Sequence, residues 1–137
     1  MSEFKDELKR DEGFRAKVYD DHLGFPTIGY GTRINELELT KEMAEYFLDK
    51  EIAEKEAGLV KIPEFNGLDN VRKDVIRSMA YQMGVTGTKN FKNMWKEIAI
   101  GDYISASDEM RDSKWWRDPA TRGRAERMAQ RMEFGIW

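Results

Sequence analysis

The segment "DEGFRAKVYDDHLGFPTIGYGT", residues 11–32, carries side chains that could take part in a reaction. They are the carboxylates of Glu12, Asp20 and Asp21 and the hydroxyl of Thr27. Two carboxylates across a cleft are the minimum equipment for cleaving a glycosidic bond. One gives a proton to the leaving oxygen, and the other stays ionised to steer water or face developing positive charge. Residue types alone are weak support for this chemistry, because charged residues make up 36% of the chain.

The elements expected to carry these groups are short. Apolar side chains one turn apart in residues 1–11 predict a helix that Gly13 would end, with Glu12 in its last turn. "KVYD" and "TIGYGT" predict two strands joined by the turn residues "DHLGFP". Gly29 and Gly31 alternate in the second strand, which would leave one bare face for a ligand or another backbone.

The remainder of the chain predicts helices. Thr40 is a plausible N-cap for a long connecting helix, and "IPEFNG" is the best candidate for a lobe boundary. Asp69 can cap a central core helix that carries an i, i+4 apolar stripe and closes at Gly84 and Gly87. Further helices are expected near 92–100, 102–112 and 122–133, with the methionines and tryptophans in the core. The predicted fold class is α+β and predominantly helical, with a small β-hairpin lobe.

Composition limits the function classes. The 137 residues fit one domain, and the absence of cysteine means that the fold needs no disulfides. Residues 1–65 carry a net charge of −6 and residues 66–137 a net charge of +3, without the clearly basic domain expected of a nucleic-acid binder. No apolar run approaches the roughly 20 residues that span a membrane, and the N-terminus has no apolar signal core.

The order and spacing of "DEG", Y-x-D and "TIGYG" resemble the signature of the phage-type lysozymes, the muramidase family that includes the T-even phage lysozymes. "SMAYQMGVTG", "SKWW", "TRGRAER" and the terminal "FGIW" extend the resemblance over nearly the whole chain. It implies a single lysozyme-like domain over 1–137. The N-terminal lobe would cover about 12–60, and the helical C-terminal lobe about 66–137 with helix 1–11 packed on it.

The resemblance also implies roles. Glu12 becomes the general acid, Asp21 the second carboxylate nine positions later, and Thr27 the hydroxyl near the catalytic water. Neighbouring side chains on a strand point to opposite faces, so Asp20 should face solvent or cap the turn. Arg124, in "TRGRAER", is expected within salt-bridge reach of Glu12. The positions expected to bind substrate are Tyr81, Gln82 and Arg33, and no metal or organic cofactor is implied.

The implied function is a peptidoglycan hydrolase that cleaves the β-1,4 bond between N-acetylmuramic acid and N-acetylglucosamine, with inversion, for bacterial cell lysis. We expect a monomer that binds the glycan strand, without nucleic acid or membrane insertion. It would be made in the bacterial host cytoplasm, without a signal peptide, and released to the wall through a separate membrane pore. The alternatives are a catalytically inactive member that binds wall or a partner, and a lytic transglycosylase.

Overall fold

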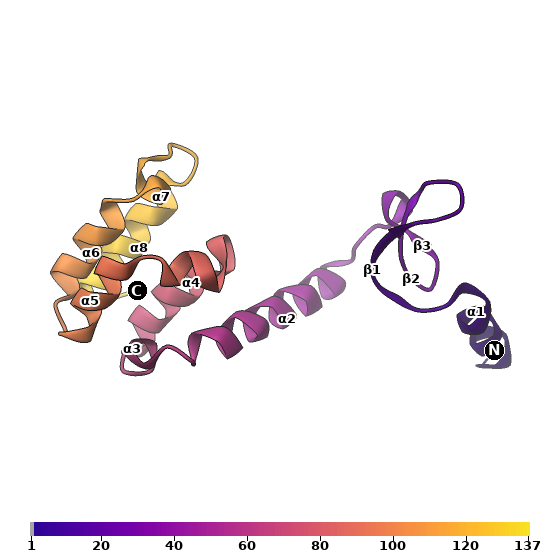
Figure 1. Cartoon of the computed structure of the whole chain (residues 1–137), viewed down its shortest axis with the longest axis horizontal. Coiled ribbons are helices and arrows are strands. Elements are labelled where there is room, and N and C mark those ends of the chain that lie inside the picture. Colours follow the sequence, from indigo (N-terminus) through magenta and orange to yellow (C-terminus); the bar gives the residue numbers. More distant parts are fainter. Residues whose placement is uncertain (1) are drawn as a thin grey trace. The chain divides into compact units, whose positions relative to one another are not determined.

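The computed structural model describes residues 2–137, which form two compact units, Met1–Ala44 and Glu45–Trp137. The fold is α+β and mainly helical with one small antiparallel sheet, which confirms the predicted class. The elements of the first unit labelled in Figure 1 are α1 (Ser2–Glu12), β1 (Arg15–Asp20), β2 (Pro26–Gly29) and β3 (Thr32–Arg33), and the 3₁₀ turn η1 (Ile34–Glu36) follows β3. Among the described residues, no helix is both long and apolar enough to span a bilayer.

The sheet of the first unit has the strand order β1-β2-β3, so β2 is the central strand. Thr27 of β2 pairs with Tyr19 on one side and with Arg33 on the other. Its side chain is only 2% exposed. The register therefore buries the candidate hydroxyl residue at the centre of the sheet.

The two glycines of "TIGYGT" do not lie in one strand, so the expectation of a bare glycine face is wrong. β2 ends at Gly29 and β3 begins at Thr32. Gly29 and Gly31 have φ of +71° and +77°, in the left-handed region where an extended strand cannot continue. They form the β2–β3 turn instead. Gly13, with φ of +72°, ends α1 as predicted, and its N–H donates to the Lys9 carbonyl at 3.0 Å.

α2 (Lys41–Leu59) links the two units along the chain, and its predicted N-cap is confirmed. The Thr40 hydroxyl accepts the Met43 N–H at 3.1 Å. The "IPEFNG" segment is the one-turn helix α3 (Pro63–Asn66) inside the second unit, and the chain divides after Ala44 instead. The packing of residues 1–11 on the helical lobe concerns the relation between the two units and stays a prediction.

The second unit is built around α4 (Asn70–Lys89), which Asp69 caps as predicted by accepting the Arg72 N–H at 3.2 Å. Gly84, with φ of +83°, interrupts this helix where its end was expected, but the helix resumes and runs through Gly87 to Lys89. The helices that follow are α5 (Lys92–Ala99), α6 (Tyr103–Arg111), α7 (Lys114–Arg117) and α8 (Arg122–Phe134). The sequence patterns missed the single turn α7, which is too short for an apolar period.

The core of the second unit lies between these helices, with α6 packed against both α5 and α8 (Figure 1). Five of the methionines and two of the tryptophans expected there supply much of it, whereas Met43 on α2 is 38% exposed and Met1 lies outside the described residues. The central residues, all less than 10% exposed, are Val75, Ile76, Met79, Met94, Trp95, Ile98, Met110, Trp115, Met128 and Met132.

A bidentate ion pair fastens α2 to α4. Arg77 donates from Nε and Nη2 to the two carboxylate oxygens of Glu56, at 2.7 and 2.9 Å. Arg77 also contacts Asp74 at 2.9 Å. The hydrogen bonds from Arg77 hold the pKa of the Glu56 carboxyl below its ordinary value, although burial opposes them. The ion pair therefore stabilises the fold above the ordinary glutamate pKa, and this contribution is lost as pH falls through the lowered pKa of the folded state.

We expect Glu56→Gln to lower the free energy of unfolding near pH 7 by about 0.5–1 kcal/mol, a modest value because both partners are about one-third exposed. The difference from the wild type should vanish in acid, where Glu56 is protonated in both states. Thermal melts between neutral pH and pH 3 measure this, with the exposed Glu51→Gln on the same helix as the control. A difference that persists in acid would contradict the assigned role.

Candidate functional site

Glu12 lies at the end of α1, and its carboxylate rests against the β2–β3 turn. A Cβ atom placed on Gly31 would lie 2.6 Å from Glu12 Oε2 and 3.0 Å from its carboxyl carbon. Only glycine allows so close an approach, and the backbone of Gly31 is left-handed as well. Gly31 therefore leaves room for the first acid beside the turn. The Glu12 side chain is exposed.

Asp21 occupies the turn between β1 and β2, and its carboxylate organises that turn. Oδ1 accepts the backbone N–H groups of Leu23 and Phe25, both at 2.9 Å. The hydrogen bond from Phe25 is the main reason why the pKa of Asp21 lies below its ordinary value, and Leu23 and the nearby Arg33 lower it further against some desolvation. Asp21 is thus held ionised in a fixed orientation, with its side chain 16% exposed.

The adjacent Asp20 differs in environment. It is the last residue of β1, lies opposite Pro26 and is exposed, as expected. The turn is closed by the carboxylate of Asp21 rather than by that of Asp20. His22, which follows in the same turn, is exposed too. Of the two aspartates, only Asp21 has its carboxylate oriented by backbone donors.

The Thr27 hydroxyl has a defined hydrogen-bond direction. Oγ1 donates to the Phe25 carbonyl at 2.8 Å, within the same turn that Asp21 organises. A hydroxyl whose proton is committed in this way has its lone pairs left to accept a hydrogen bond. Thr27 Oγ1 therefore keeps lone pairs that can accept a hydrogen bond from a water molecule.

Arg33, expected to bind substrate, contacts the second carboxylate instead of standing apart from it. Its Nε lies 3.4 Å from Asp21 Oδ2, and its guanidinium stacks over the Phe25 ring at 4.5 Å from the centroid. A third contact reaches Glu36 at 3.9 Å. This positioning role was missed because it depends on the pairing of β3 with β2, which the interpretation of "TIGYGT" as one strand excluded.

Tyr81 and Gln82 lie on α4 in the second unit, and both are exposed. The Gln82 amide is oriented by a distant residue, since Trp115 Nε1 donates to Gln82 Oε1 at 3.0 Å. This hydrogen bond turns the amide oxygen of Gln82 toward the indole. The amide N–H groups of Gln82 are then left as donors for a ligand. Contact of these residues with the same sugar chain as the acids stays a prediction.

Arg124, on α8, holds α4 within the second unit. Its Nη2 donates to the hydroxyl and carbonyl oxygens of Ser78 at 3.0 and 3.3 Å. The expected ion pair with Glu12 would join the two units and stays a prediction. Within residues 2–137, no group of three or more His, Cys, Asp or Glu side chains is arranged to hold a metal ion.

The family model described as phage lysozyme matches residues 9–131. The chain therefore belongs to the phage lysozyme family.

Individual relatives differ in length. The chain is 31% identical to the pre-baseplate central spike protein of Enterobacteria phage T4, over 88% of this chain but 26% of that protein. It is 30% identical to probable T4-type lysozyme 1 of Dictyostelium discoideum, over 98% of this chain and 96% of the relative. It is also 35% identical to the endolysin of Acyrthosiphon pisum secondary endosymbiont phage 1, over 79% and 73%. The chain thus spans about a quarter of the spike protein and nearly all of the Dictyostelium lysozyme.

We expect Gly31→Ala to displace the Glu12 carboxylate and to destabilise the protein by about the ~1–2 kcal/mol that a left-handed alanine costs, because the exposed Glu12 side chain can move away from the added methyl group. Gly29→Ala is the matched control, because Gly29 has a similar φ but no atom within 4 Å of an added Cβ. Thermal melts and the ¹³C carboxyl signal of Glu12 report the two effects. A Glu12 signal that does not move in Gly31→Ala would refute the close approach of the Glu12 carboxylate to Gly31.

We expect Arg33→Gln to raise the pKa of Asp21, because a nearby cation that favours the carboxylate is lost. The rise should be partial, since the N–H groups of Phe25 and Leu23 remain. Titration of the Asp21 carboxyl signal by NMR measures it. Arg15→Gln is the control, since Arg15 stacks on Tyr19 and has no ion pair with Asp21 among the described residues. An unchanged Asp21 titration in Arg33→Gln would contradict the assigned contact.

Proposed function

We propose that the protein is a peptidoglycan hydrolase of the muramidase type, which cleaves the β-1,4 bond between N-acetylmuramic acid and N-acetylglucosamine. The observation that carries this proposal is that two carboxylates of the first unit, those of Asp21 and Glu12, have different surroundings. Asp21 is oriented and kept ionised by two backbone donors and Arg33. Glu12 ends a helix and lies exposed beside the β2–β3 turn, without such backbone donors among the described hydrogen bonds.

Glu12 acts as the general acid in this proposal. It gives its proton to the glycosidic oxygen as the bond to the anomeric carbon breaks, so that the leaving sugar departs as an alcohol. The positive charge that develops on the ring is stabilised by the ionised Asp21. Family membership supports the assignment of these two roles, because both residues fall within the matched segment.

In this proposal, Asp21 and Thr27 orient the water molecule that attacks the sugar. A water that donates one hydrogen bond to Thr27 Oγ1 and the other to Asp21 would be oriented for attack on the anomeric carbon. Asp21 then takes the proton from the attacking water, and the enzyme is regenerated when Asp21 releases this proton to solvent and Glu12 takes one up. Water entering opposite the leaving oxygen inverts the configuration and needs carboxyl groups roughly 6.5–9.5 Å apart.

Sugar binding is assigned to the second unit. Gln82 presents amide N–H groups, fixed by Trp115, to hydroxyl or carbonyl oxygens of the glycan. Tyr81, at 39% exposure, offers an aromatic face of the kind that packs against sugar rings. Binding energy from these contacts would hold the scissile bond near the acids.

The two alternatives differ from hydrolysis in ways that can be measured. An inactive wall-binding member would have no need for an ionised Asp21 and a committed Thr27 hydroxyl. A lytic transglycosylase forms an anhydro sugar without water, so the water-orienting pair of Asp21 and Thr27 favours hydrolysis over it. Mass analysis of the sugars released from purified walls separates hydrolytic from anhydro products.

We expect Glu12→Gln to remove at least ~99% of the activity while the fold survives, since general acid catalysis contributes ~10²–10⁴-fold. The measurement is the initial rate at which purified cell walls clear, beside a thermal melt of the same variant. A folded Glu12→Gln protein that clears walls at nearly the wild-type rate would refute the proposed mechanism.

Asp21→Asn should slow clearing by roughly 100-fold or more, because each ~1.4 kcal/mol of barrier is tenfold in rate. The amide oxygen of asparagine still accepts the N–H groups of Leu23 and Phe25, so the turn is kept while the charge is lost. Asp20→Asn is the matched control and should change stability by no more than roughly 0.5 kcal/mol with turnover nearly intact. If Asp20→Asn were the inactive variant, the catalytic roles would be misassigned by one residue.

A further inference from the structure

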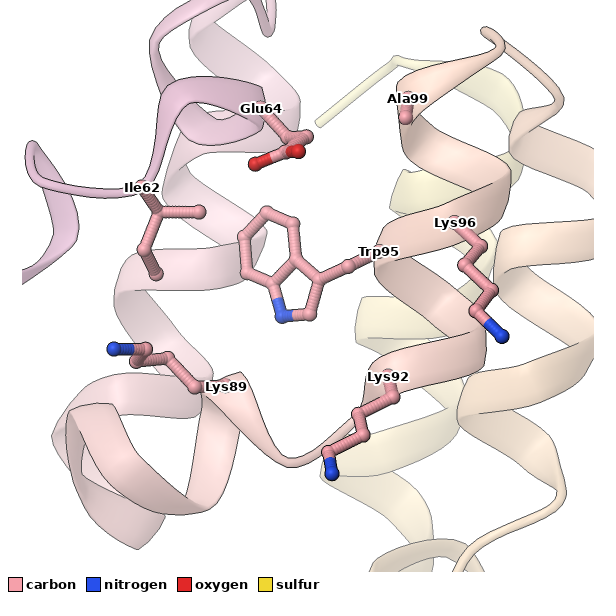
Figure 2. A pocket seen from close by; sticks show the side chains of 7 residues that line it. All are labelled: Ile62, Glu64, Lys89, Lys92, Trp95, Lys96 and Ala99. Atoms are coloured by element: carbon pink, nitrogen blue, oxygen red, sulfur yellow. The ribbon is translucent and has the colours of Figure 1, made fainter.

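A pocket between α3 and α5 in the second unit is lined by residues that have no role in the proposed hydrolase site. It has a volume of about 420 Å³, within the ~300–1,000 Å³ range typical of small-molecule sites. Figure 2 shows the indole of Trp95 at its centre, between Ile62 and helix α5. The lining residues are Ile62, Glu64, Lys89, Lys92, Trp95, Lys96 and Ala99.

The floor of the pocket is apolar and fixed in place. Trp95 is 9% exposed, and its Nε1 donates to the Thr88 carbonyl at 3.0 Å, which locks the ring plane. Ile62, also 9% exposed, packs with Trp95 in the core cluster. The indole therefore presents an ordered apolar surface rather than a mobile side chain.

The rim of the pocket is cationic. Lys89, Lys92 and Lys96 line the pocket together with one carboxylate, that of Glu64, and in Figure 2 the Lys96 ammonium group points away from Trp95. None of the three lysines has a carboxylate within 4.0 Å in the part of the chain that the structure describes. Lys92 and Lys96 stand one turn apart on α5, where like charges repel. An anion in the pocket would relieve that repulsion.

The charges also have a direction. In Figure 2 the Glu64 carboxylate lies on one side of the Trp95 ring, and the ammonium groups of Lys89 and Lys92 lie on the other. An anionic head would be drawn to the lysine side and repelled from Glu64. A neighbouring hollow of about 470 Å³ shares Glu64 and Ala99 as lining residues and reaches Leu68 and Tyr103. This leaves room for an elongated body.

We propose that this pocket binds an amphiphilic anion, whose apolar chain lies along Trp95, Ile62 and Ala99 and whose carboxylate or phosphate head is held by Lys89 and Lys92. Charge-assisted hydrogen bonds from the ammonium groups would orient the anionic head. Burial of the apolar chain against the indole would contribute the hydrophobic part of the binding free energy, which has no preferred direction. The site is separate from the acids of the first unit and does not depend on the proposed hydrolase activity.

The test uses three probes with one chain length, octanoate, octyl phosphate and octan-1-ol, each below its critical micelle concentration. Binding is followed through the Trp95 indole N–H signal in NMR titrations of the full chain. We expect saturable binding of at least one anion and much weaker binding of the alcohol. The two anions distinguish a carboxylate from a phosphate preference. No saturable shift with either anion, or equal binding of the alcohol, would overturn the proposal.

Variants locate the site. Lys89→Gln combined with Lys92→Gln should weaken anion binding by about tenfold or more, since an ionised partner strengthens each hydrogen bond. Ala99→Trp should abolish it by filling the pocket, and Ala99 is exposed enough for the fold to tolerate the change. Lys114→Gln, an exposed lysine on α7 outside the pocket, should leave binding unchanged. Undiminished binding in both pocket variants would place the ligand elsewhere and refute the assignment.

Discussion

The candidate carboxylates of the first unit lie beside tight backbone turns: Gly31 leaves room for Glu12, and Asp21 closes its own turn through two backbone N–H groups. Within the described part of the first unit, Thr27 is the only residue that is more than nine-tenths buried. Such a unit is ordered by ladder hydrogen bonds and turns more than by an apolar core of its own.

The second unit is organised in the opposite way. Its core is filled by methionine and tryptophan, and its polar groups are fixed at the edges of that core. Arg72 donates to the carbonyls of Met132 and Glu133, at 2.6 and 3.0 Å, which ties the end of α8 to the start of α4. Trp115 fixes the Gln82 amide in the same manner. A packed frame thus orients the groups proposed to hold sugar, whereas the acids stand on a small sheet.

The two proposed ligand sites differ in the sign of their charge. The first holds carboxylates that take part in chemistry, and the second holds lysines around an apolar floor. The match to a quarter of a phage spike protein and to nearly all of a Dictyostelium lysozyme shows the same family sequence in chains of very different length. A lysine pocket in the unit that lacks the acids could gain or lose its ligand without altering the acids themselves.

Local signals in the sequence determined much of this protein. Gly13 as a helix end, Thr40 and Asp69 as caps, and the apolar stripe of α4 follow from neighbours a few residues apart, because caps and periods are local. The spacing of Glu12, Asp21 and Thr27 likewise identified the candidate site by resemblance. Tertiary structure alone decided the contacts Arg33–Asp21, Gly31–Glu12 and Trp115–Gln82. Each of them depends on strand register or helix packing that brings distant residues together, and no local pattern encodes such a meeting.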